Sequence, residues 1–124
     1  MSTPAAATET RTLIERMYAA AGAGDLATLR EVLAEDVVIE AAPFVPYGGT
    51  YRGFEEFVGC FGKAAELIDF TGLQLDGITA DDEHAYGRVR VPFVDGSGEA
   101  RILEEWTVRD GRVVAGRVFY FDRP

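Results

Sequence analysis

The chain has very few of the side chains that most often carry disulfide, metal or redox chemistry. Its 124 residues include one cysteine, Cys60, and one histidine, His84. A single cysteine excludes a disulfide within the chain and fits a reducing compartment such as the cytoplasm. A single histidine disfavours a transition-metal site, and no loop of spaced acidic ligands predicts Ca²⁺ or Mg²⁺. Phosphate loops, nucleophile elbows and dinucleotide fingerprints are also missing, so we expect neither a metal nor a cofactor.

Basic residues and long apolar runs are scarce as well. The chain has 12 Lys and Arg against 21 Asp and Glu, a formal net charge of −9. This balance repels nucleic acids and anionic membrane surfaces. No apolar run approaches the roughly 18 residues that span a bilayer, and residues 1–10 lack the basic and apolar segments of a secretion signal. We therefore expect a soluble, cytoplasmic protein that binds neither nucleic acid nor membrane.

Apolar residues, in contrast, are plentiful enough for a substantial core. They make up 48% of the chain, and a chain of this length forms one domain. We expect a single domain over residues 1–124. Its first eight residues are small and polar, so we expect them to be flexible.

Hydrophobic periodicity predicts helices in the first half of the chain and strands in the second. In chain order, the predicted elements are a helix from Thr8 or Thr10 to Gly22, a helix over 25–33, a strand over 36–40, a loop over 43–50, a helix over 53–67, and strands over about 69–79, 84–94, 100–109 and 112–122. The Asp110-Gly111 pair between the last two strands is a strong hairpin signal. This order indicates an α+β fold, in which a curled antiparallel sheet with helices on one face encloses a pocket.

The last two strands put acidic and aromatic side chains on a face that should be apolar. Alternate residues of a strand share a face, which gathers Ile102, Glu104, Trp106 and Val108 in one strand and Gly116, Val118, Tyr120 and Asp122 in the next. A buried carboxylate without a partner costs several kcal/mol, or takes up a proton. Such groups are therefore either paired or used, and the pattern points to small-molecule chemistry.

From this pattern, and from Tyr18 at the helical spacing of apolar residues in the first predicted helix, we predict three catalytic residues, Glu104, Asp122 and Tyr18. Asp122 acts as the base, Glu104 is held protonated by its apolar setting and stabilises an enolate oxygen, and Tyr18 donates a hydrogen bond. The predicted substrate contacts are Trp106, Tyr120, Tyr47, Tyr51, Phe57, Phe61, Val118 and Arg90.

Several of these residues also have an ordinary structural interpretation. Glu104 can pair with Arg88 or Arg90 across the neighbouring strand, and Asp122 can be an exposed residue near the C-terminus. Arg88 and Arg90 share one strand face, which is either the pocket or a face toward solvent or a second subunit. Glu105 faces away from Glu104, so we expect it at solvent or at a dimer face.

The order of the elements and three short motifs resemble the nuclear transport factor 2-like superfamily. The motifs are Ala23-Gly24-Asp25-Leu26, Gly49-Thr50-Tyr51-Arg52-Gly53 and the closing Tyr120-Phe121-Asp122. Within the superfamily, residues 10–122 are most similar to the SnoaL-like group, which includes polyketide cyclases and relatives of ketosteroid isomerase. The resemblance implies a cone-shaped fold, with three N-terminal helices on a curved sheet around a pocket. It also implies a homodimer that pairs through the sheet.

The active residues of these relatives are only partly present. The base of ketosteroid isomerases falls at about Ala41, with Glu40 beside it. Their tyrosine acid falls at about Met17, with Tyr18 adjacent, and their protonated carboxyl falls at about Glu104. The last-strand aspartate of the similar limonene epoxide hydrolases falls near Val118, whereas the late aspartate of SnoaL-like cyclases matches Asp122.

The leading hypothesis is therefore a cofactor-independent enzyme that abstracts and returns a proton. Its substrate is an apolar, carbonyl-bearing or polycyclic small molecule, as for an isomerase, polyketide cyclase or dehydratase. A second hypothesis is epoxide opening, which needs a second acid that Glu40 supplies only if a bulge turns it inward. A third is a module that binds a small molecule or dimerises without catalysis.

Overall fold

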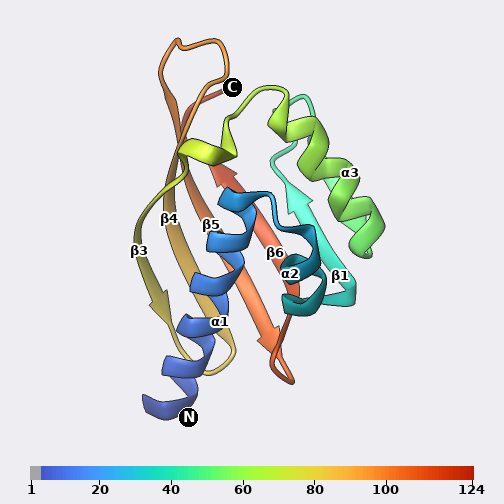
Figure 1. Cartoon of the computed structure of the whole chain (residues 1–124), viewed down its shortest axis with the longest axis vertical. Helices are drawn as coiled ribbons and strands as arrows, with labels where there is room; N and C mark the ends of the chain where they lie inside the picture. Colours follow the sequence, from blue (N-terminus) through green and yellow to red (C-terminus); the bar gives the residue numbers. More distant parts are fainter. Residues whose placement is uncertain (1–3) are drawn as a thin grey trace.

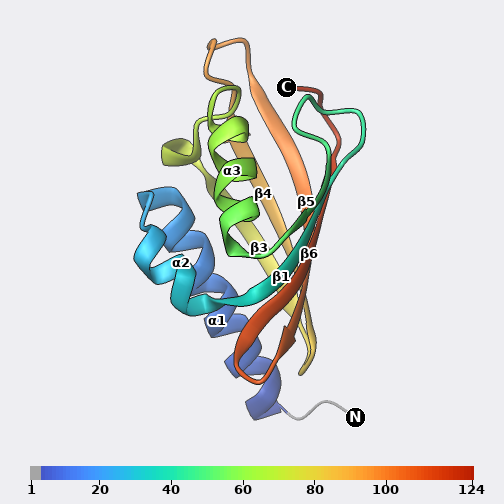
Figure 2. The ribbon, with the colours of Figure 1, turned by 90° about the vertical axis from the view of Figure 1, so that its right-hand side faces the viewer.

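Three helices lie on one face of a six-stranded sheet that curls around them (Figures 1 and 2). The structure is a computed structural model, and it describes residues 4–124. The helices are α1 (Pro4–Ala23), α2 (Leu26–Val32) and α3 (Phe54–Ala65), with a short 3₁₀ helix η1 (Phe70–Gly72). The strands are β1 (Leu33–Ala41), β2 (Gly49–Arg52), β3 (Gln74–Ala80), β4 (His84–Pro92), β5 (Glu99–Arg109) and β6 (Arg112–Tyr120). This is the α+β arrangement that the sequence predicts.

The strands are ordered β2-β1-β6-β5-β4-β3 in the sheet. Every neighbouring pair is antiparallel except β1 and β6, which run parallel. The predicted hairpin between β5 and β6 is confirmed. Asp110 and Gly111 have φ angles of 53° and 75°, which is the left-handed backbone that a tight two-residue turn requires.

The helix signals act locally as expected. Asp25 caps α2, because its carboxylate accepts a hydrogen bond from the Thr28 backbone N–H at 3.1 Å. The predicted start of the first helix at Thr8 or Thr10 is too late, because α1 begins at Pro4. Proline at the first helical position and the alanines that follow favour a helix there, and Thr10 is buried. The flexibility expected for residues 1–8 stays a prediction. Residues 1–3 lie outside the described residues.

Two short elements have no hydrophobic pattern long enough to predict them. β2 occupies the end of the predicted 43–50 loop and extends beyond it, with Tyr51 opposite Ile39 of β1. The strand expected from residue 69 begins only at Gln74. Asp69 instead starts η1, because its side chain accepts a hydrogen bond from the Thr71 backbone N–H at 3.0 Å.

The core lies between the helices and the inner face of the sheet. Two glycines of that face give room for large aromatic side chains. A Cβ on Gly87 of β4 would lie 2.2 Å from the Tyr18 hydroxyl, and a Cβ on Gly116 of β6 would lie 2.3 Å from the Trp106 ring. The seating of Tyr18 and Trp106 on the sheet thus depends on the absence of two side chains.

We predict that Gly87→Ala destabilises the protein by about 1–3 kcal/mol, because the added methyl displaces Tyr18 from a packed position. Urea unfolding measures this change. The control is Gly59→Ala on α3, where a Cβ meets no atom within 4 Å. There, alanine in a helix should be neutral or stabilising by up to about 1 kcal/mol. Equal stability of the Gly87→Ala protein and the unchanged protein would contradict the prediction.

Candidate active site

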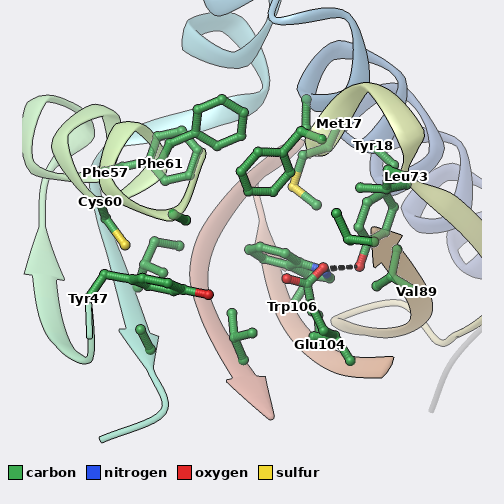
Figure 3. A pocket seen from close by; sticks show the side chains of 18 of the residues that line it. Met17, Tyr18, Tyr47, Phe57, Cys60, Phe61, Leu73, Val89, Glu104 and Trp106 are labelled. Carbon is green, nitrogen blue, oxygen red and sulfur yellow. Dashed lines mark hydrogen bonds between the residues drawn. The ribbon is translucent and has the colours of Figure 1, made fainter. Parts of the chain in front are cut away.

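A cavity of about 100 Å³ lies between the helices and the inner face of the sheet (Figure 3). Its wall is mostly aliphatic and aromatic, with side chains from α1, α3, the segment after α3 and strands β1, β4, β5 and β6. The polar or ionisable side chains in the lining are Tyr18, Tyr47, Cys60, Glu104, Trp106 and Tyr120. Such a mainly apolar hollow with a few polar groups is typical of small-molecule sites.

Three of these groups form one hydrogen-bonded chain. The indole Nε1 of Trp106 donates to the Tyr18 hydroxyl at 2.8 Å, and this hydroxyl donates to Glu104 Oε1 at 2.8 Å. The Tyr18 and Trp106 rings meet edge to face, with centroids 6.3 Å apart. Tyr18 is thereby fixed as a donor toward Glu104, because its own oxygen already accepts from Trp106.

The second carboxyl oxygen of Glu104, Oε2, has no hydrogen-bond partner among the residues that the structure describes. Glu104 is half-buried and lines the cavity. Burial raises the pKa of Glu104 from 4.5 to about 7, although the bond from Tyr18 acts in the opposite direction. Both the acid and the carboxylate are therefore populated near neutral pH.

The tyrosines of the cavity stay protonated at neutral pH. Burial and the neighbouring Glu104 raise the pKa of Tyr18 far above its usual value. Burial raises the pKa of Tyr47 to about 12, and burial together with Tyr47 raises that of Tyr120. The Tyr47 and Tyr120 hydroxyls are hydrogen-bonded to each other. Burial also raises the pKa of Cys60, so its thiol is not activated as a nucleophile.

Most of the predicted site residues do meet at this cavity. Tyr18, Glu104, Trp106, Tyr120, Tyr47, Phe57, Phe61 and Val118 all lie in its lining. Sequence reasoning missed Phe70 and Leu73, because that segment was assigned to a strand. Phe70 stacks on Phe61 with ring centroids 4.3 Å apart. The sequence also indicated Trp106 only as a substrate contact, without the hydrogen bond that its indole donates to Tyr18.

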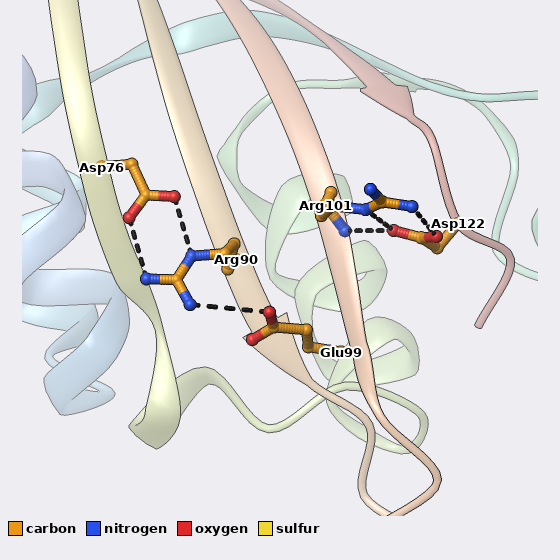
Figure 4. A network of polar contacts seen from close by, with 5 residues as sticks. All are labelled: Asp76, Arg90, Glu99, Arg101 and Asp122. Atoms are coloured by element: carbon orange, nitrogen blue, oxygen red, sulfur yellow. Dashed lines mark hydrogen bonds and ion pairs between the residues drawn. The ribbon is translucent and has the colours of Figure 1, made fainter.

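The prediction that Asp122 joins Glu104 is wrong. β6 ends at Tyr120, so the alternation of faces does not continue to residue 122. Asp122 instead accepts hydrogen bonds from the backbone N, Nε and Nη2 of Arg101 at 2.8–2.9 Å (Figure 4). These bonds lower its pKa to about 2, which is unsuitable for a base near neutral pH.

Arg90 and Tyr51 also lie outside the cavity lining. Arg90 pairs with Asp76 at 2.8 Å and Glu99 at 3.5 Å (Figure 4). Its neighbours Val89 and Val91 line the cavity instead. The apolar side of β4 is therefore the inner one, and the salt bridges hold Arg90 on the other. Tyr51 donates its hydroxyl proton to the Tyr47 backbone carbonyl at 2.7 Å, so it supports the lining from behind.

Glu40 does not supply a second acid to the cavity. It pairs with Arg117 of β6 at 3.1 Å, while its neighbours Ile39 and Ala41 line the cavity. No bulge turns Glu40 inward. Among the described residues, Glu104 is thus the only carboxyl group in the lining.

Across residues 4–124, no three His, Cys, Asp or Glu side chains come close enough together to hold a metal ion. None of the helices in that part of the chain is both long and apolar enough to cross a membrane. The predicted independence from metals and cofactors stays a prediction.

The fold and this cavity agree with the comparison to known families. Residues 14–116 match the sequence profile of the SnoaL-like domain, and the chain belongs to this family. The resemblance to the SnoaL-like group of the nuclear transport factor 2-like superfamily is thereby confirmed. None of the curated proteins compared with the chain matches it significantly.

Solved structures with the same fold are numerous but distant in sequence. Bal32a, from a soil-derived mobile gene cassette, has a TM-score of 0.84 and 22% identity, covering 94% of this chain and 92% of its own. A protein from Jannaschia sp. CCS1, provisionally named a SnoaL-like polyketide cyclase, has a TM-score of 0.77 and 18% identity. The match covers 98% of this chain and 90% of that protein. A protein from Kribbella flavida, provisionally named a ketosteroid isomerase, has a TM-score of 0.79 and 19% identity. The match covers 94% of this chain and 80% of that protein. At these identities the likeness shows the fold alone.

The raised pKa of Glu104 predicts a pH-dependent stability. The folded protein holds the proton up to about pH 7, but the unfolded chain releases it near pH 4.5. The contribution of Glu104 to stability is therefore fully present below about pH 4.5 and is lost as the pH rises to about 7, at a cost of about 3 kcal/mol. Glu104→Gln removes this loss.

Denaturant unfolding at pH 4 and pH 8 tests the direction of this pH dependence of stability. We expect the Glu104→Gln protein to match the unchanged protein at pH 4 and to exceed its stability at pH 8. Glu105→Gln, on the other face of β5, is the control and should show no such difference. A Glu104→Gln protein that is equally destabilised at both pH values would contradict the raised pKa.

Proposed function

We propose that the protein is a cofactor-independent enzyme that moves a proton within a small, apolar, carbonyl-bearing molecule. The observation that carries this proposal is the state of Glu104. It is the only carboxyl in the described lining, its pKa lies near neutrality, and one of its oxygens faces the cavity without a partner. A general base works best under these conditions, when its pKa lies near the working pH.

Glu104 then performs both halves of the proton transfer. The ionised carboxylate removes a proton from a carbon next to the carbonyl group, and the electrons of the C–H bond move into an enolate. The carboxyl returns the proton to another carbon of the same molecule, so the base is regenerated. Tyr18 is a positioning residue, since its bond to Oε1 leaves Oε2 directed at the substrate. Hydroxyl donors in the lining stabilise the enolate oxygen.

This assignment changes the sequence hypothesis, in which Asp122 was the base. It keeps the reaction class of isomerases, cyclases and dehydratases, which also fits the provisional names of two fold neighbours. Epoxide opening by paired acids is less well supported, because Glu40 and Asp122 are held in ion pairs elsewhere. A passive binding pocket would not need a carboxyl with a pKa near 7.

Proton exchange into single-ring ketones tests the mechanism. Cyclohex-3-enone and cyclohexanone in D₂O would be followed by NMR for isomerisation and deuterium uptake. We expect the enzyme-dependent rate to rise as Glu104 ionises through about pH 7, and Glu104→Gln to lower it by about 10²–10⁴-fold. Glu105→Gln is the matched control, with the same substitution on the opposite face, and should keep the full rate.

Two outcomes would count against the mechanism. Full exchange by the Glu104→Gln protein would rule out Glu104 as the base. Tight binding of the ketones without exchange by the unchanged protein would favour a passive binding module.

We also propose that two copies of the chain pair through the outer face of the sheet. Leu103, Phe119 and Phe121 are 43%, 47% and 75% exposed on the strands and segment of that face. A homodimer would bury these apolar side chains. The cytoplasm stays the expected location of the protein.

Light scattering measures the assembly directly. We expect a mass twice the 13.5 kDa of one chain. Phe119→Arg should shift the protein to one copy, because it places a charge in the apolar contact, whereas Glu55→Arg on the exposed side of α3 should not. A monomeric mass for the unchanged protein at high concentration would contradict the pairing.

A further inference from the structure

We propose that the hydroxyl pair of Tyr47 and Tyr120 is a second polar subsite of the cavity, which donates a hydrogen bond to an oxygen of the ligand. The ligand class that fits is a single-ring compound with oxygen groups at two opposite ends. The inference rests on the proposed function in one respect, since it takes the cavity around Glu104 as the ligand site.

The hydroxyl pair has one proton more than its mutual bond uses. Two hydroxyls carry two protons, and the bond between Tyr47 and Tyr120 uses one of them. Neither hydroxyl has another hydrogen-bond partner among residues 4–124. One proton is therefore left to donate inside an apolar cavity, where an unmade hydrogen bond is costly. A ligand oxygen that accepts this proton removes the cost.

The pair is also a better donor than a single tyrosine. A hydroxyl that accepts one hydrogen bond is polarised and donates the next more strongly. The pKa of Tyr47 is about 12 and that of Tyr120 is raised, so both hydroxyls keep their protons throughout the neutral range. The subsite consequently selects an acceptor such as a carbonyl or ether oxygen.

Glu104 and the Tyr47 hydroxyl lie on different sides of the cavity, although Glu104 and Tyr120 are carried by neighbouring strands (Figure 3). Glu104 stands opposite Val118, and Tyr120 stands opposite Ile102, so Glu104 and Tyr120 are diagonal neighbours on β5 and β6. Backbone positions in this relation are about 7–8 Å apart. Figure 3 shows Tyr47 entering from the side opposite Glu104, with its hydroxyl directed toward the cavity.

The space between the two ends is apolar and small. Phe57, Phe61 and Val118 contribute hydrocarbon there, so the middle of the ligand has nothing to hydrogen-bond. A volume of about 100 Å³ is below the ~150 Å³ of a cavity that holds benzene. Even a single ring therefore reaches from the enclosed part into the open side of the cavity, and a polycyclic ligand would extend much farther.

A purely structural role of the pair has to be separated from ligand binding. Tyr47 lies in the 42–48 connection, so its bond to Tyr120 also ties that connection to the sheet. Tyr51 holds the same connection through the Tyr47 carbonyl but does not line the cavity. Tyr51→Phe is therefore a matched control, since it loosens the connection without removing a donor from the subsite.

Calorimetric binding of three single-ring probes at pH 8 tests the subsite. The probes are 4-methoxyphenol, 4-ethylphenol and 4-methylanisole, which have similar shapes but carry both oxygens, only the hydroxyl, or only the ether. We expect 4-methoxyphenol to bind about fivefold to tenfold more tightly than 4-ethylphenol. The Tyr47→Phe/Tyr120→Phe protein should lose this ratio, with its affinity for 4-ethylphenol unchanged.

The other variants assign the two ends separately. Tyr51→Phe and Glu104→Gln should both keep the preference for the ether oxygen, but Glu104→Gln should lose the preference for 4-methoxyphenol over 4-methylanisole. Circular dichroism verifies that each variant is folded. The double variant is needed because either tyrosine alone keeps one free hydroxyl proton.

Three results would overturn the subsite. They are equal affinities of the unchanged protein for the two phenols, a ratio that survives in the double variant, and a Tyr51→Phe protein that loses the ratio equally. None of these would remove Glu104 as the base, which deuterium exchange measures, but the stabilisation of the enolate oxygen by hydroxyls of the lining would be lost from the mechanism. Failure of the unchanged protein to bind any of the three probes would instead contradict the cavity as a ligand site, and with it both proposals.

Discussion

The bond from Tyr18 to Glu104 is the interaction on which the rest of the site depends. It joins α1 to the middle of β5, and it leaves the carboxyl with one oxygen occupied and one open. Trp106 fixes its direction. A buried carboxyl without this partner would be harder to ionise, since hydrogen bonding to the charged form is what opposes desolvation. The same hydrogen bond therefore both holds α1 against the sheet and lowers the pKa that burial raises in Glu104.

The same constraint explains much of the inner sheet face. The tyrosine reaches Glu104 only because β4 has no side chain at Gly87, and the indole reaches Tyr18 only because β6 has none at Gly116. The aromatic rings of α3 and η1 close the other side. A hollow that is apolar, small and asymmetric in its polar groups follows from these few large side chains.

The fold and about half of the chemistry could be predicted from the sequence. Alternation along β5 placed Glu104 and Trp106 on the inner face, and helical spacing placed Tyr18 toward the sheet. Alternation failed for Asp122, because a strand's end depends on hydrogen bonds that periodicity does not report. Arg90 was misassigned since its role depends on Asp76 and Glu99, which other strands supply. The hydrogen bond between Tyr47 and Tyr120 joins the 42–48 connection to β6. The two residues are far apart in the sequence, so no local pattern predicts it.

The parallel pairing of β1 with β6 has a consequence for how the molecule is made. These strands come from opposite halves of the chain, yet they are neighbours within the sheet. Contacts so distant in sequence form slowly, because a long loop must close before they stabilise anything. During synthesis, β1 and the first helices must wait for the final segment to leave the ribosome. The cavity therefore forms last, when translation is nearly complete.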